Sequence, residues 1–207
     1  SPEEFIPLFE SSGFITRFAM YIWKSVCKTL AAWQDKGCKL VPISINVSMI
    51  DITNIDVPQY LSMLTEQYHI SPEYLPVEIT ESVFAESNTI VKNTITRFHK
   101  KGFYVLMDDF GSGYSSLNVL SKLQIDELKI DRIFLHTKSE VDNQRTKWIL
   151  ESIIDIAKKS QILVVVEGEE SKQDDLFIKN LGADVGQGYF YGRPLTISAF
   201  NDLFETK

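Results

Sequence analysis

The chain has 207 residues, of which 44% are hydrophobic, 12% aromatic and 24% charged. This composition supplies enough apolar material for a buried core, and it excludes a disordered or fibrous chain. The net charge of −7 disfavours a surface that binds nucleic acids or anionic membranes. We therefore expect one globular domain over 1–207, with no second domain and with no DNA, RNA or membrane contact.

Apolar, strand-like runs alternate with amphipathic helices along the chain. Strands are predicted at 40–47, 75–80, 104–110, 126–130, 161–168 and within 183–192. Helices are predicted at 16–36, 56–69, 87–101, 141–160, 171–181 and 196–205. Strands that are nearly all followed by a helix indicate a parallel α/β sheet with right-handed crossovers.

Two parallel architectures fit this alternation, an open doubly wound sheet and a β/α barrel. An open sheet of the Rossmann or P-loop type should have a glycine fingerprint after its first strand, and Gly111-Ser112-Gly113 lacks the required spacing. A barrel instead places polar catalytic side chains at the C-terminal ends of several strands. That pattern is present, so we predict a TIM-like (β/α) barrel.

Each predicted strand has a polar residue within it or at its end, where burial alone would favour an apolar one. These residues are Asn46, Glu78, the pair Asp108 and Asp109, Lys129, Glu167 and Gln187. Taken singly, each carboxylate would be interpreted as a turn former or helix cap, and the lysine as a solvated edge residue. A series over six consecutive strands is not explained in that way, because a buried charge is costly unless it is paired or bound to a metal.

The side chains of this series favour one kind of chemistry. Amide and carboxylate oxygens are ligands for Mg²⁺, Mn²⁺ or Ca²⁺ rather than for zinc. An adjacent aspartate pair together with carboxylates from other strands can hold two ions about 3.5–4 Å apart, as in hydrolases of phosphate esters. Lys129 would then orient the attacking water or stabilise negative charge on the phosphate.

Six motifs in order carry a resemblance to a known family. They are NVS at 46–48, EITES at 78–82, DDFGSGYSS at 108–116, LKIDR at 128–132, VEGEE at 166–170 and GQGYFYGRP at 186–194. Over residues 2–205 the sequence resembles the EAL-domain family of cyclic di-GMP phosphodiesterases, which have a modified β/α barrel. The resemblance implies hydrolysis of cyclic di-GMP to linear pGpG with two divalent cations, Mg²⁺ or Mn²⁺.

The resemblance also implies a role for each motif residue. Asn46, Glu78 and Asp108 are similar to ligands of the first metal, and Asp108 and Asp109 lie where the family binds the second. Lys129 resembles the lysine that contacts the hydrolytic water, and Glu167 the glutamate proposed as general base or second-metal contact. The supporting residues are Gln187, which resembles the glutamine of the site, and Asp131, next to the lysine.

The segment 109–116, with Gly111, Ser112 and Gly113, resembles the family's loop that couples metal binding to dimerisation. Glu81 resembles the glutamate that anchors this loop. We therefore expect a homodimer formed through the loop. The first ten residues show no signal peptide, so we expect a cytoplasmic location, either alone or within a larger signalling protein, including a membrane-anchored one.

Two departures from the family pattern stand out. Glu169 replaces a usually apolar residue, and it is interpreted either as a turn charge or as a modifier of metal affinity. No Glu-Ala-Leu sequence occurs in the chain, although the family's first strand has this motif and its glutamate binds metal. We therefore expect an N-terminally truncated EAL domain, a barrel missing its first strand or strands, with weak or no hydrolysis by the 207-residue chain.

Two alternatives remain open at this point. The first is a non-catalytic relative that binds cyclic di-GMP as a sensor or acts as a protein-interaction adaptor. The second, outside the family, is another magnesium-dependent barrel enzyme.

Overall fold

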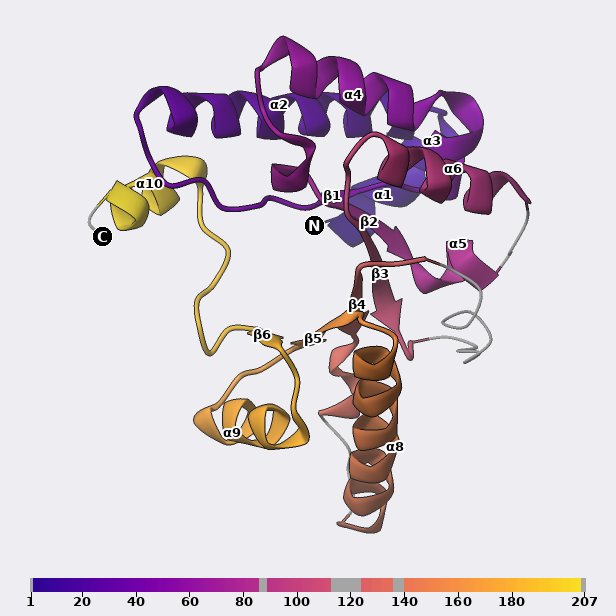
Figure 1. Ribbon diagram of the computed structural model, residues 1–207, viewed down its shortest axis with the longest axis vertical. Helices are drawn as coiled ribbons and strands as arrows, with labels where there is room; N and C mark the ends of the chain where they lie inside the picture. Colours follow the sequence, from indigo (N-terminus) through magenta and orange to yellow (C-terminus); the bar gives the residue numbers. More distant parts are fainter. Residues whose placement is uncertain (1, 86–88, 113–123, 136–139, 206–207) are drawn as a thin grey trace. The chain divides into compact units, whose positions relative to one another are not determined.

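A computed structural model describes residues 2–85, 89–112, 124–135 and 140–205 of the chain (Figure 1). The chain divides into two compact units. The first unit covers 1–107 and 116–125, and the second covers 108–115 and 126–207. None of the described helices is both long and apolar enough to cross a membrane.

The strands follow one another in sequence order in a single sheet. They are β1 (Ile45–Asn46), β2 (Val77–Thr80), β3 (Val105–Phe110), β4 (Glu127–Ile130), β5 (Leu163–Glu167) and β6 (Val185–Gln187). The pairs β1·β2, β4·β5 and β5·β6 are parallel. Parallel neighbours in chain order are the arrangement of barrel strands, and they confirm the predicted α/β class.

The first unit is built around helix α2 (Ile15–Asp35), whose buried face includes Trp23, Cys27 and Leu30. Burial raises the pKa of the Cys27 thiol to about 11, and both cysteines are free thiols. The other helices of this unit are α1 (Pro2–Ser11), α3 (Met49–Asn54), α4 (Val57–Gln67), the 3₁₀ turn η1 (Pro72–Tyr74), α5 (Glu81–Ala85) and α6 (Thr89–Lys100). Among them, α1, α3 and α5 are additions to the predicted elements.

The strand predicted at 40–47 is shorter than expected. Only Ile45 and Asn46 are in β1, although the amide of Ile43 already donates to the carbonyl of Tyr74 at 3.0 Å. Pro42 has no amide hydrogen, so it cannot donate to a neighbouring strand. The regular ladder therefore begins only after this proline.

The second unit packs helix α8 (Glu140–Lys159) against β5, and Figure 1 shows α8 as the long helix of this unit. Leu150, Ile154 and Ala157 lie on its buried face. The remaining elements of the unit are the 3₁₀ turn η2 (Arg132–Phe134), α9 (Lys172–Leu181) and α10 (Ile197–Glu205). Helix α9 begins at a capping box between Ser171 and Asp174, which satisfies amides that a helix start leaves without partners.

Candidate functional site

Three carboxylates of the second unit lie together at the ends of two strands. Asp108 and Asp109 belong to the end of β3, and Glu167 is the last residue of β5. One oxygen from each of the three lies within 4.8 Å of the others, and all three side chains are partly buried. Carboxylate oxygens are the donors that Mg²⁺ and Mn²⁺ prefer, so this donor set fits the implied divalent ion.

Lys129, on β4, connects the carboxylates of the two strands. Its Nζ lies 3.1 Å from Oδ1 of Asp108 and 2.7 Å from Oε1 of Glu167. Only 7% of the lysine side chain is exposed. Lys129 is therefore not a solvated edge lysine, and its charge is compensated by two carboxylates, as a buried ammonium requires.

The backbone makes a sharp turn at the second aspartate. Asp109 has φ of +58°, a left-handed conformation that aspartate tolerates better than most residues. Its carbonyl accepts from the amide of Ser112 at 3.1 Å and from the Ser112 hydroxyl at 2.8 Å, and its amide donates to Oδ1 of Asp108 at 3.0 Å. Gly113, predicted to belong to the same loop, lies outside the described residues.

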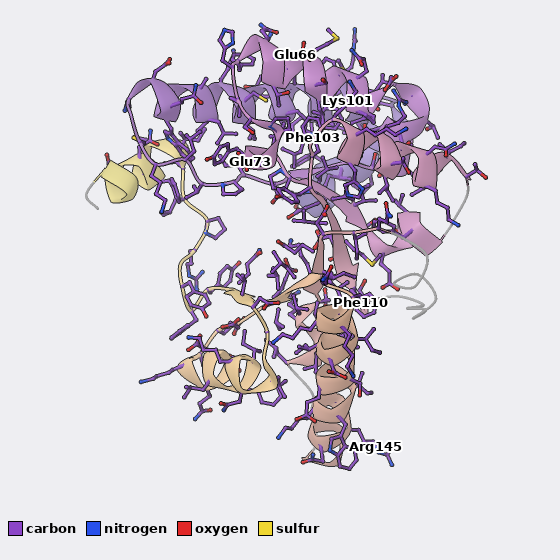
Figure 2. The ribbon with its side chains drawn as sticks, viewed as in Figure 1. Glu66, Glu73, Lys101, Phe103, Phe110 and Arg145 are labelled. Carbon is purple, nitrogen blue, oxygen red and sulfur yellow. The ribbon has the colours of Figure 1, made fainter. Side chains whose placement is uncertain are left out.

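Asp131 supports this region through its backbone and its side chain, and Gln187 through its backbone. The Asp131 amide donates to the carbonyl of Phe110 at 3.1 Å, and its Oδ1 accepts from the amide of Ile133 at 2.8 Å. Figure 2 labels Phe110, the last residue of β3. Gln187 stands opposite Glu167 in the β5·β6 register, and its carbonyl accepts from the amide of Gly168 at 2.8 Å. The Gln187 side chain is exposed.

The first unit brings two other predicted site residues next to each other. Asn46, the last residue of β1, is the register partner of Glu78, which lies within β2. The amide of Val47 donates to the carbonyl of Glu78 at 2.9 Å. Glu78 is buried, and so is Glu81, the first residue of α5. The indole Nε1 of Trp23 donates to the carbonyl of Asn46 at 3.0 Å. Sequence reasoning missed this contact, because the sequence of the helix at 16–36 does not indicate which distant backbone carbonyl an indole will meet.

Glu169 is fully buried in the second unit, so it is not a solvated turn charge. Burial raises the pKa of this carboxyl, and the hydroxyl of Tyr191, a hydrogen-bonding group that acts on it, offsets only part of that effect. A Cβ added to Gly186 would lie 1.9 Å from Oε1 of Glu169, and one added to Gly188 would lie 2.1 Å from its carbonyl oxygen. The two glycines that flank Gln187 therefore leave the space that Glu169 occupies.

A family model and curated relatives both match this chain over most of its length. The family model of the EAL domain matches residues 1–194. The probable cyclic di-GMP phosphodiesterase PdeB of Escherichia coli is 33% identical over 94% of this chain, and the cyclic di-GMP phosphodiesterase PdeR of the same organism is 30% identical over 99%. The chain spans about a third of the length of these relatives, 36% and 30% respectively.

A solved structure agrees with the sequence comparison. The EAL enzyme Bd1971, in a form with cAMP and cyclic di-GMP bound, superposes with a TM-score of 0.88 and 28% identity. The match covers 99% of this chain and 56% of that one. The fold is thus the TIM-barrel-like fold of these enzymes, as the sequence predicts, and the chain belongs to the EAL domain family.

Proposed function

We propose that this chain is a metal-dependent phosphodiesterase that hydrolyses cyclic di-GMP to linear pGpG in bacterial second-messenger signalling. The observation that carries this proposal is the group of three carboxylates within 4.8 Å, with Lys129 bridging two of them, in a chain of the EAL domain family. The names of the relatives and the ligand of Bd1971 support cyclic di-GMP as the substrate.

In this proposal Asp108, Asp109 and Glu167 hold divalent cations, Mg²⁺ or Mn²⁺, with Asn46 and Glu78 as further oxygen ligands. Two such ions would lower the pKa of a bound water and neutralise the phosphate. The ammonium of Lys129 stabilises the negative charge that develops on the phosphoryl oxygens. Glu167 would take the proton of the attacking water as the water oxygen bonds to phosphorus. The ester bond between phosphorus and the ribose oxygen would break, and that oxygen would gain the proton and leave as the hydroxyl of pGpG.

The supporting residues keep the catalytic groups in place. Gln187 fixes the strand end beyond Glu167 through its carbonyl, and Asp131 fixes the turn after β4. We assign Glu81 and the loop residues Gly111, Ser112 and Gly113 to the coupling between metal binding and a homodimer through 109–116. The domain would work in the cytoplasm as one domain of a larger signalling protein.

The proposal is tested by incubating the 207-residue chain with cyclic di-GMP and Mg²⁺ or Mn²⁺ and separating the products by chromatography. We expect pGpG to form slowly, because the 207 residues contain no Glu-Ala-Leu sequence. The Asp108→Asn variant should give none, while Asp126→Asn, which changes an aspartate before β4, should retain the activity. Equal turnover by wild type and Asp108→Asn would exclude the assigned site.

The alternative function for a domain of this family is non-catalytic binding of cyclic di-GMP or of a protein partner. Equilibrium dialysis with cyclic di-GMP separates the two. Binding without turnover at any metal concentration would support the sensor, whereas neither binding nor turnover would leave the adaptor role. Formation of pGpG that depends on Asp108 would support the phosphodiesterase.

A further inference from the structure

The turn that follows β4, residues 131–134, contacts the end of β3 in the second unit. We call it the spacer turn. A Cβ added to Gly111 would lie 2.1 Å from Cε2 of Phe134, so the phenyl ring rests directly on this glycine. Gly111 has φ of +100°, a conformation that other residues rarely adopt. The hydrogen bond from the Asp131 amide to the Phe110 carbonyl, 3.1 Å long, joins the same two segments.

The spacer turn also contacts the end of β5. A Cβ added to Gly168 would lie 2.2 Å from Cβ of Arg132 and 3.2 Å from its Cα. Gly168 directly follows Glu167 and has φ of +83°. The side chain of Arg132 thus packs against the backbone just after one metal-binding carboxylate, as Phe134 does two residues after Asp109.

The turn is itself held in shape. Oδ1 of Asp131 accepts from the amide of Ile133 at 2.8 Å, and the amide of Phe134 donates to the carbonyl of Asp131 at 3.3 Å. One short, hydrogen-bonded segment therefore contacts both strand ends that carry the acidic residues. If the end of β3 moved relative to the end of β5, the contact of Phe134 with Gly111 or that of Arg132 with Gly168 would have to be compressed or broken.

We propose that the spacer turn, through Phe134 on Gly111 and Arg132 on Gly168, sets the separation of the Asp109 and Glu167 carboxylates and thereby selects Mg²⁺ over Ca²⁺. The inference rests on the proposed function only in taking these carboxylates as metal ligands. Mg²⁺ demands near-octahedral oxygens at about 2.0–2.1 Å, whereas Ca²⁺ accepts flexible geometry at about 2.3–2.6 Å. A rigid spacing therefore favours the smaller ion, and a loosened one reduces the preference.

The test is calorimetric titration of the full chain with Mg²⁺ and with Ca²⁺, without substrate. Phe134→Ala removes the ring on Gly111 and should weaken Mg²⁺ binding about tenfold, as the loss of groups that orient metal ligands commonly does. Ca²⁺ binding should change little. Ile133→Ala is the matched control, because Ile133 lies in the same turn and is 57% exposed, and it should leave both affinities unchanged. Equal losses for the two ions, or no loss, would overturn the proposal.

A second pair of variants keeps the proposal testable if Phe134→Ala folds poorly. Gly111→Ala should weaken Mg²⁺ binding, both because its Cβ meets the ring and because its φ is unfavourable. Phe134→Leu, a smaller side chain, should recover part of that loss in the double variant. Strictly additive losses in the double variant would contradict the contact as the cause.

These measurements separate the two proposals. Mg²⁺ binding that depends on Phe134 in a chain that does not turn over cyclic di-GMP would refute the proposed catalysis and leave the spacer role intact. Normal turnover in a Phe134→Ala chain with an unchanged ratio of Mg²⁺ to Ca²⁺ affinity would refute the spacer role and leave the proposed catalysis intact.

Discussion

Lys129 is the residue on which the chemistry of the candidate site depends most directly. Its ammonium lies within 3.1 Å of a carboxylate oxygen on each of two strands, and it is nearly inaccessible to solvent. Charge stabilisation is strong where water is excluded, because the local dielectric constant is low. The lysine therefore has both the position and the environment to act on a phosphate bound beside Asp108 and Glu167.

The first prediction concerns this ammonium. Lys129→Met keeps the length of the side chain and removes the charge, so we expect turnover of cyclic di-GMP to fall by about a hundredfold or more. Mg²⁺ affinity should not weaken, because a cation that competes for the same two carboxylates has been removed. Kinetic assays and calorimetric titration measure the two effects. Lys159→Met, whose lysine side chain is 75% exposed, is the control, and turnover unchanged in Lys129→Met would contradict the assignment.

Glu169 places a carboxyl group in the buried interior of the second unit. Its carboxyl is fully buried, and the cost of that burial outweighs the favourable effect of the Tyr191 hydroxyl, so it destabilises the folded state. The sequence marked this position as a departure from the family pattern, but it did not show that the side chain points inward against Gly186. That contact depends on the path of β6, which is distant in sequence.

The second prediction follows from this burial. Glu169→Met has a similar shape and no charge, so we expect the free energy of unfolding to rise by about 1–3 kcal/mol. Urea denaturation followed by tryptophan fluorescence measures the change. Glu170→Met is the matched control, because the neighbouring glutamate is exposed, and it should leave stability nearly unchanged. A less stable Glu169→Met variant would mean that the favourable effect of the Tyr191 hydroxyl outweighs the cost of burial.

At the scale of elements, helices begin soon after the strand ends that carry site residues. Ser48 caps α3 two residues after Asn46, and Ser171 caps α9 four residues after Glu167. Both are capping boxes, in which an aspartate at the third helical position returns a hydrogen bond to the serine amide. The same short connections that end the strands therefore also fix where the next helices start.

The third prediction tests one of these caps. Ser171→Ala removes the hydroxyl that accepts from the Asp174 amide at 3.2 Å and donates to its Oδ2 at 2.8 Å. We expect a loss of about 1 kcal/mol in the free energy of unfolding. Thermal and urea denaturation measure it. The exposed Ser160, after α8, provides the comparison as Ser160→Ala, and a loss of the same size there would show that the cap is not responsible.

The sequence predicted most elements of the fold, because apolar strand runs and glycine stops are local signals. Gly182, with φ of +90°, ends α9 where the pattern places a helix stop. Helix α1 was not predicted, although Phe5 and Phe9 have helical spacing and their rings are 5.4 Å apart. Helix α3 has only six residues, too few for a periodic pattern.

The site was predictable in its residue types and much less so in its geometry. Charges within LKI and VVEG indicate paired or metal-bound groups, and Lys129 does contact carboxylates from two strands. The left-handed backbone of Asp109 and the ring of Phe134 on Gly111 could not be predicted. The ring contact results from packing between segments that are distant in sequence, and the turn at Asp109 depends on local hydrogen bonds that the residue types alone do not specify.

At the scale of the whole molecule, metal binding should be visible as stability. An ion that binds only the folded chain raises the free energy of unfolding, by about 2.7 kcal/mol at a hundredfold excess over its dissociation constant. We expect Mg²⁺ and Mn²⁺ to raise the melting temperature, and Asp108→Asn to lose most of this increase. Differential scanning fluorimetry measures it. An equal increase in wild type and Asp108→Asn would show that the ions act elsewhere.

The ion pairs of Lys129 also bear on whether the chain folds before or after it binds metal ions. Small zinc domains have no preformed site in the unfolded chain, so the free energy of metal binding is what folds them. Here a covalently attached cation already sits between Asp108 and Glu167, at 3.1 and 2.7 Å. The chain can therefore fold first and acquire its ions later, so that a chelator should stop turnover reversibly without unfolding the protein.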